Sequence, residues 1–186
     1  MLFKNLLRIT ISLVIAAGGH AQETPTSINN PIPQIELSPT SASPELEQCL
    51  SPVTSFSDDK LKHCEAALAG TREPATRARI FTAMSQWSVN KGDLVTASRH
   101  IEDALAIAPD DPSVLNNWGA ILIRQDSFAA ATDAFSRGLL GAQQSTQSPE
   151  LTGVLYHNRS IALRALGEYA EAAADYAEYL RIMRLN

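Results

Sequence analysis

Two cysteines and a neighbouring histidine are the residues whose types and spacing could do chemistry. Cys49 and Cys64 are the only cysteines, and His63 directly precedes the second. Three interpretations are open: a disulfide, a metal site that includes His63, and a thiol redox pair. A metal site lacks an evident fourth ligand, and redox pairs are typically Cys-x-x-Cys. We therefore expect a disulfide, which closes a loop of roughly 15 residues and contributes about 3 kcal/mol.

Catalytic motifs are not found in the sequence. It has no His-Glu-x-x-His, no Gly-x-Ser-x-Gly and no phosphate-binding loop, and its histidines are isolated: His20, His63, His100 and His157. The acidic residues of 101–105 and 167–180 are expected on solvent-facing helix positions, whereas catalytic carboxylates must converge on one point. We expect no enzyme, no catalytic residue, no metal and no cofactor.

Residues 1–21 have the layout of a secretory signal peptide. Lys4 and Arg8 precede an apolar run over 9–17, and Gly19-His20-Ala21 provides a small-x-small ending. The run is shorter than the roughly 20 apolar residues that span a bilayer, although an uncleaved anchor is the alternative. We expect cleavage after Ala21, export, and no stable membrane insertion afterwards. The favoured compartment is the periplasm of a Gram-negative bacterium, where paired cysteines usually join; secretion is the alternative.

Residues 22–44 are predicted to be a linker. They are rich in Ser and Thr and contain five prolines, which remove backbone donors and disfavour helix. A docking or O-glycosylated segment is the alternative for this region.

The charge balance argues against nucleic acid as a partner. The whole chain has 15 Lys+Arg and 20 Asp+Glu. Loss of Lys4 and Arg8 leaves 15 − 2 = 13 basic residues against 20 acidic ones, or −7. No basic cluster remains to bind phosphates or anionic lipid.

A recurring pattern organises the rest of the chain. The stretches 91–105, 125–139 and 166–180 align, and their starts are 34 and 41 residues apart. Each has a turn pair followed by a large residue, an alanine three positions on and a bulky residue four further on. The alanines are Ala97, Ala131 and Ala172; the bulky residues are Ile101, Phe135 and Tyr176. Spacings of three and four predict a helix.

Each stretch follows a second helix-like segment, over 78–89, 112–123 and 153–164. Large residues align at Phe81, Leu115 and Tyr156, and small ones at Ser85, Gly119 and Ser160. Small residues let two helices approach closely, so we expect these positions to meet Ala97, Ala131 and Ala172 at the crossings.

A unit of 34 residues with two helices resembles the tetratricopeptide repeat. The resemblance implies an all-α helical-hairpin solenoid of about three repeats, at 78–111, 112–145 and 153–186, with an insert at 146–152. Residues 45–77 are expected to form a degenerate helical hairpin that caps the first repeat and carries the disulfide. The layout is similar to small exported bacterial proteins with a cysteine pair ahead of such repeats. Arg159 departs from the family, which often has leucine there.

The resemblance places a binding groove on the first helix of each unit. In several family members an asparagine there holds the backbone of an extended peptide, and Asn117 and Asn158 match that position. A carboxamide can both donate to and accept from a peptide group. In the alternative interpretation, these asparagines face water or cap a neighbour. The predicted groove residues are Arg79, Gln86, Asn90, Asn116, Asn117, Arg124, His157, Asn158 and Arg164.

The expected function is therefore non-catalytic binding of a protein or extended peptide in the cell envelope. No lysine falls on the groove positions, so we do not expect the family's carboxylate clamp, but the three arginines favour an acidic peptide. The alternative is an assembly subunit of a periplasmic or outer-membrane complex that docks through its C-terminal helix. Without a further capping helix, Ile182 and Leu185 would be exposed there and could form a homodimer.

Overall fold

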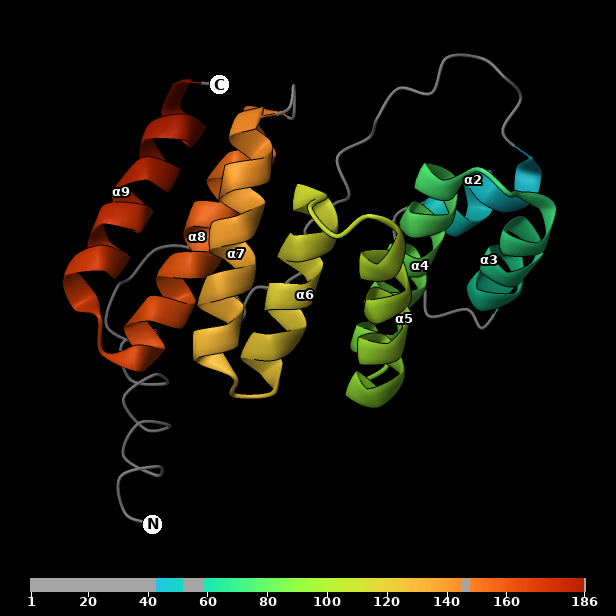
Figure 1. Ribbon diagram of the computed structural model, residues 1–186, viewed down its shortest axis with the longest axis horizontal. Coiled ribbons are helices and arrows are strands. Elements are labelled where there is room, and N and C mark those ends of the chain that lie inside the picture. The colour runs from blue at the N-terminus through green and yellow to red at the C-terminus, as the bar shows by residue number, and fades with distance from the viewer. Residues whose placement is uncertain (1–42, 52–58, 145–147, 186) are drawn as a thin grey trace, which may run out of the picture.

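The computed structural model describes residues 43–51, 59–144 and 148–185, and within these it is all-helical (Figure 1). This confirms the predicted all-α class. The predicted signal peptide and nearly all of the predicted linker lie outside the described residues. The eight helices of the described part are α2 (Pro44–Leu50), α3 (Asp59–Gly70), α4 (Pro74–Asn90), α5 (Leu94–Ile107), α6 (Pro112–Arg124), α7 (Phe128–Gln144), α8 (Pro149–Leu166) and α9 (Tyr169–Leu185).

The long helices pair in sequence order. The most extensive contacts join α4 to α5, α6 to α7 and α8 to α9, and α7 also packs closely on α8. Contacts between α4 and α6, and between α6 and α8, bring every second helix together. Figure 1 shows the pairs following one another along the long axis of the molecule, with α9 at one end and α2 and α3 at the other.

Local sequence signals explain where these helices begin. Pro74, Pro112 and Pro149 each occupy the start of the first helix of a pair, where a missing backbone N–H costs nothing. The residue before each proline caps the helix by accepting hydrogen bonds from first-turn N–H groups. Consequently α4 begins at Pro74, four residues before residue 78, where the first helix was predicted to begin. Likewise, α8 includes residues 149–152 of the predicted insert.

The turns inside the three pairs repeat the same backbone device. Gly92, Asp126 and Gly167 have φ values of 81°, 58° and 87°. This left-handed region favours glycine, and Asp is among the few other residues that tolerate it. The three residues lie at equivalent places in the aligned stretches, so the recurring turn pair in the sequence corresponds to a recurring turn.

Small residues line the helix crossings, as the sequence predicts. Ala97 and Ala131 are fully buried and Ala172 is 7% exposed. The Ser85 hydroxyl donates to the Ala97 carbonyl oxygen at 3.0 Å, which places these two residues at one crossing. At Gly119 the closest neighbour is the ring of Phe135 rather than Ala131. A Cβ added to Gly119 would lie 2.5 Å from that ring.

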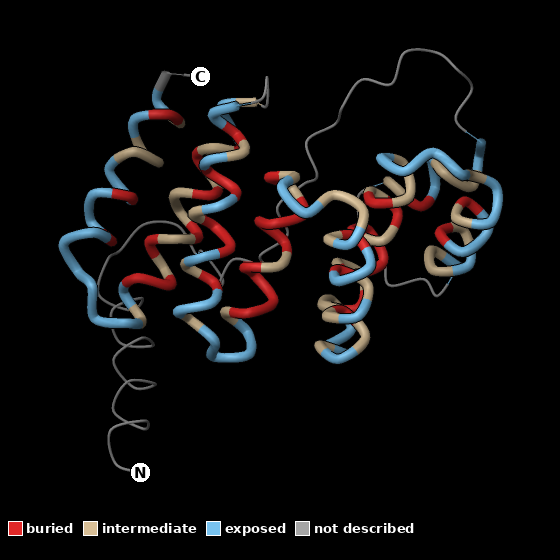
Figure 2. Tube along the Cα trace, viewed as in Figure 1, coloured by how far each residue is buried: buried red, intermediate tan, exposed pale blue. Residues whose placement is uncertain are grey.

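The core runs along the inner sides of the paired helices (Figure 2). Phe135 and Leu155 are fully buried in the cluster between α6, α7 and α8, and Ile101 and Val114 belong to the cluster between α5 and α6. None of the described helices has the length and apolarity needed to cross a membrane.

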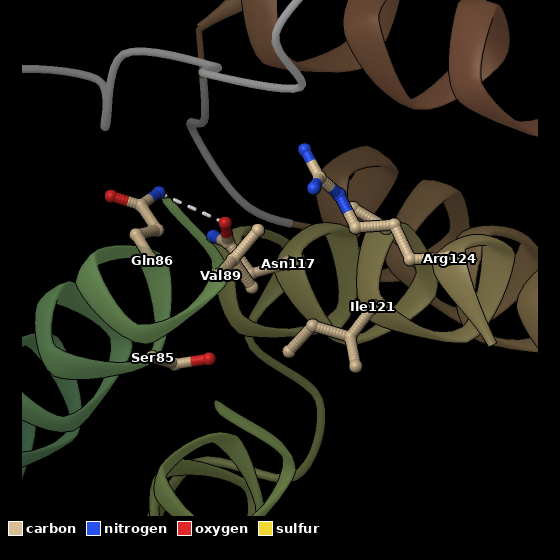
Figure 3. Close-up of a pocket in the computed structure, with 7 residues that line it drawn as sticks. Ser85, Gln86, Val89, Asn117, Ile121 and Arg124 are labelled. Carbon is tan, nitrogen blue, oxygen red and sulfur yellow. Dashed lines mark hydrogen bonds between the residues drawn. The ribbon is translucent and has the colours of Figure 1, made fainter. Parts of the chain in front are cut away.

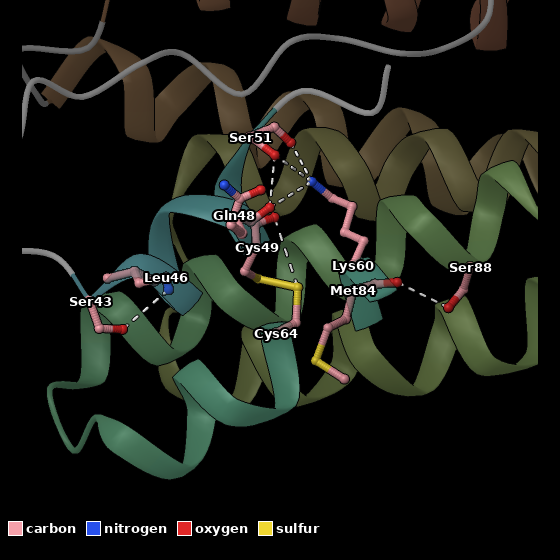
Figure 4. Close-up of a disulfide and its surroundings, with 9 residues drawn as sticks. All are labelled: Ser43, Leu46, Gln48, Cys49, Ser51, Lys60, Cys64, Met84 and Ser88. Carbon is pink, nitrogen blue, oxygen red and sulfur yellow. Dashed lines mark hydrogen bonds between the residues drawn. A yellow bond between two sulfur atoms is a disulfide. The ribbon is translucent and has the colours of Figure 1, made fainter. Parts of the chain in front are cut away.

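The N-terminal hairpin, α2 and α3, covers the start of α4. A disulfide joins Cys49 to Cys64 across a Cα–Cα distance of 4.6 Å, which confirms the predicted pairing. Its sulfurs are buried with Ile80 and Met84 of α4. Figure 4 shows Lys60 reaching from α3 to the end of α2, where its ammonium donates to the carbonyl oxygens of Gln48 and Ser51.

The last helix corrects two expectations. Ile182 is only 8% exposed, because it packs on α8 beside Gly153, so it is not part of an exposed C-terminal face; the Leu185 side chain lies outside the described residues. Asp175, expected in solvent with the other acids of this stretch, is 6% exposed and ion-paired. The exposed large apolar residues of α9 are Tyr169, at 66%, and Tyr176, at 46%.

Candidate functional site

The shared surface of α4, α6 and α8 brings together several of the predicted groove residues. Arg79 and Gln86 are seven residues apart on α4, and Asn117 and Arg124 are seven apart on α6. Seven residues are nearly two helical turns, so each pair lies along one side of its helix. Because α4 and α6 are in contact, these two rows run next to each other.

A hydrogen bond joins the two rows. The Gln86 side chain donates from Nε2 to Oδ1 of Asn117 at 2.9 Å, as Figure 3 shows. Asn117 in turn donates from Nδ2 to the Ser113 carbonyl oxygen at 2.8 Å. Asn117 is thereby oriented and 9% exposed, so part of the hydrogen-bonding capacity expected for a ligand is used within the protein.

An equivalent bond links α6 to α8. Asn158 donates from Nδ2 to Oδ1 of Asn116 at 2.9 Å, and the two residues are 5% and 2% exposed. Buried carboxamides need such partners. Asn116 is therefore packed between the helices rather than displayed on a surface, and the interpretation of an asparagine that caps its neighbour describes this pair.

The pocket between α4 and α6 is narrow. It is lined by Ser85, Gln86, Val89, Asn117, Ala120, Ile121 and Arg124. Its volume of about 10 Å³ suits roughly one water molecule. Figure 3 shows the Arg124 side chain extending on the same side as the Gln86–Asn117 bond. A pocket of this size is too small to enclose a small-molecule ligand.

Positive charge flanks the Gln86–Asn117 bond at both ends. Arg124 is exposed, and Arg79 is half-buried at the other end of the α4 row. Burial lowers the pKa of Arg79 from its usual value, while Glu73 opposes this shift. Its Nε is buried, and no hydrogen-bond partner for it occurs among the described residues. Arg79 as a whole is only half-buried, so the exposed part of its side chain, and not the buried Nε, is what a ligand's carboxylate could meet.

Three predicted residues lie elsewhere on this surface. Asn90, one turn beyond Gln86, is half-buried near the end of α4. His157 faces α9, where its ring centroid is 4.8 Å from that of Tyr179 and 6.0 Å from that of Tyr176. Arg164 is exposed and seven residues from His157, so it shares the His157 side of α8 rather than the Asn158 side.

One polar cluster was not found from the sequence. Arg159 of α8 donates to Asp175 of α9 through Nε at 2.7 Å and Nη2 at 2.8 Å, and Nη1 donates to the Ser136 hydroxyl of α7 at 3.0 Å. The hydrogen bond and the charge of Asp175 raise the pKa of Arg159. The signal available in the sequence was Arg159 itself, which departs from the pattern that the sequence otherwise resembles.

The two cysteines and the acidic residues of the described chain are its candidate metal ligands. Both thiols are consumed by the disulfide, so the alternative in which they bind a metal with His63 does not apply to the oxidised chain. Within the described ranges, no group of three or more His, Cys, Asp or Glu side chains is arranged to hold a metal ion. What the α4/α6/α8 surface offers is hydrogen-bonding amides beside guanidinium groups.

Comparison with known proteins adds no family. No protein-family model matches the chain, and no curated protein matches it significantly.

Proposed function

We propose that this chain is a non-catalytic binding module of the tetratricopeptide-repeat type, exported to the cell envelope, that holds an extended acidic segment of a partner protein. The bound segment would lie across α4 and α6, over the Gln86–Asn117 bond and between Arg79 and Arg124. Recurring helical hairpins, turns with positive φ at equivalent places, and alanines at the crossings support the repeat assignment. The disulfide fits an oxidising compartment.

The observation that carries the function is the pairing of oriented amides with flanking arginines on one surface. Gln86 and Asn117 hold each other in place, so a ligand need not order them on binding. Arg124 is exposed at one end, and Arg79 is half-buried at the other. An extended peptide with carboxylates spaced along it would satisfy both guanidinium groups while its backbone meets the amides.

The test is a peptide-binding comparison with a matched charge reversal. A synthetic array of extended acidic peptides, and the same peptides with Asp and Glu replaced by Asn and Gln, would be titrated against the full chain. Arg124→Glu should weaken binding of acidic peptides by about tenfold or more, since bonds to charged groups contribute roughly 1.5–3 kcal/mol. Arg99→Glu, an equally exposed arginine on α5, is the control and should bind as the wild type does.

Two results would contradict this function. Acidic and amidated peptides that bind equally would remove the role of charge, and indifference to Arg124→Glu would move the site elsewhere. Arg164→Glu provides a further distinction: because Arg164 lies on the His157 side of α8, its reversal should have a smaller effect than that of Arg124.

A second candidate is an assembly subunit that docks through its last helix. The observation in its favour is the exposure of Tyr169 and Tyr176 on α9, since exposed aromatic residues are typical of interaction surfaces. In that case Arg124→Glu would leave assembly intact while changes on α9 would abolish it.

A further inference from the structure

The helices α4 and α6 run in nearly the same direction. Short connections at 91–93 and 108–111 separate α4 from α5 and α5 from α6, and the chain reverses at each of them. The contacts agree with two reversals. Val89, next to the end of α4, and Arg124, at the end of α6, line the same pocket, as they must when the helices are parallel.

The Gln86–Asn117 bond sets the separation of the two arginines that flank it. Arg79 precedes Gln86 by seven residues, and Arg124 follows Asn117 by seven. At about 1.5 Å per residue, each arginine lies roughly 10 Å from the bond along its helix, and the two lie in opposite directions. Because the bond holds the rows next to each other, the Cα atoms of Arg79 and Arg124 are separated by roughly 21 Å along the common direction.

An extended peptide covers this separation in about six residues, since each residue of an extended chain advances about 3.3 Å. Successive side chains of such a peptide point to opposite sides. Residues i and i+6 therefore face the same side, whereas residues i and i+5 or i and i+7 do not. The distance between the arginines and the alternation of the ligand's side chains select the same spacing for two carboxylates.

The part of the peptide between its two acids crosses the hydrogen-bonded amides. Gln86 and Asn117 each use one side-chain N–H group within the protein. A carboxamide has two such groups, so each side chain keeps one for a carbonyl oxygen of the peptide backbone. The pocket between the helices has a volume of about 10 Å³, so no large side chain enters it. Recognition of the middle of the peptide therefore depends on its backbone and not on its sequence.

We propose that the partner segment carries two acidic residues six positions apart, one bound at Arg79 and the other at Arg124. This proposal rests on the proposed function and narrows an acidic segment to a defined pattern. Arg79 makes the spacing selective: it is half-buried and its Nε is buried, so it follows a displaced carboxylate less freely than the exposed Arg124 does.

A series of peptides with the same composition tests the spacing. Each would contain two Glu in an otherwise uncharged extended sequence, at a spacing of three, five or six residues, and would be titrated against the full chain. The peptide with spacing six should bind at least about fivefold more tightly than the other two, because only it forms both charge-assisted contacts. Versions with Gln in place of Glu measure the preference for charge.

Substitutions of Arg79 show whether this residue is responsible. Arg79→Gln should remove the preference for spacing six and keep the preference for Glu over Gln, because Arg124 still meets one carboxylate. Arg79→Lys retains the positive charge and should retain the spacing preference, as should Arg99→Gln on α5, which is the control.

Three results would overturn the spacing: equal binding of the three Glu peptides, tightest binding at another spacing, or a preference for six that persists in Arg79→Gln. If Glu peptides still bind more tightly than Gln peptides in these cases, the proposed function stands without the spacing. Equal binding of Glu and Gln peptides would instead remove the proposed function, and the spacing with it.

Discussion

The carboxylate of Asp175 receives two hydrogen bonds from the guanidinium of Arg159, at 2.7 and 2.8 Å, across the interface between α8 and α9. Their side chains are 8% and 24% exposed. Arg159 also reaches the Ser136 hydroxyl, so one side chain ties three successive helices together.

We expect Asp175→Leu to lower the free energy of unfolding by about 3 kcal/mol, because it leaves a largely buried guanidinium without its partner. The double variant Arg159→Leu with Asp175→Leu should lower the free energy of unfolding by much less than the sum of the two single changes, since neither charge is then left buried without its partner. Urea unfolding of the four proteins measures this coupling. Additive losses would show that the two groups contribute independently.

Gly119 provides a test of the close helix approach. A Cβ at this position would lie 2.5–2.9 Å from three atoms of the Phe135 ring. We expect Gly119→Ala to lower the stability by about 1–3 kcal/mol through overpacking, and Phe135→Leu in the same chain to restore part of it. Gly70→Ala is the control, because nothing lies within 4 Å of the added methyl group there. Equal melting temperatures for the two alanine variants would contradict the close contact.

Removal of the disulfide should loosen the N-terminal hairpin selectively. Cys49→Ala with Cys64→Ala should lower the free energy of unfolding by about 3 kcal/mol, through the greater freedom of the unfolded loop. Amide hydrogen exchange should accelerate in α2 and α3 and remain unchanged in α8 and α9. A uniform acceleration along the chain would instead indicate that the hairpin and the helical pairs unfold as one unit.

Stability should depend on pH through His100. Burial lowers the pKa of His100, Arg99 adds to this, and Asp103, Asp93 and Glu65 oppose it. The unfolded chain then binds the proton more readily than the folded one, so the contribution is complete above the ordinary histidine pKa of about 6.5 and declines as the pH falls below it. Urea unfolding of His100→Gln at several pH values should show a flatter profile in this window, and Arg99→Gln should flatten it in part. A wild-type slope in His100→Gln would assign the effect to other groups.

Much of the fold was predictable because it depends on local spacing. The burial of Ala97 and Ala131 follows from helical periodicity, and the pairing of Cys49 with Cys64 follows from residue type. The neighbour of Gly119 was not predictable, because a repeat indicates which sides of two helices meet but not which side chain fills the space between them. That side chain is Phe135, one helical turn beyond the expected Ala131.

The candidate site was predictable only in outline. Helical spacing places Gln86 on one row and Asn117 and Arg124 on another, and a hydrogen bond from Gln86 to Asn117 joins the two rows; that they form a groove for a ligand stays a prediction. The bond between Asn116 and Asn158 joins residues 42 positions apart, and helical periodicity says which side a residue lies on without giving the distance to the next helix. The prediction for Asp175 was wrong for a related reason. An acidic residue in an alanine-rich helix is usually exposed to solvent, and the burial of Asp175 depends on its ion pair with Arg159.

The side-chain hydrogen bonds from Gln86 to Asn117 and from Asn158 to Asn116 also resist separation of the helices that they join. They join α4 to α6 and α6 to α8 by directional contacts, in addition to the Arg159–Asp175–Ser136 cluster that joins α7, α8 and α9. Moving α4 away from α6, or α6 away from α8, must therefore break one of these hydrogen bonds. If the proposed partner binds there, the distances between the groups that it meets are fixed before it arrives, so binding need not order them.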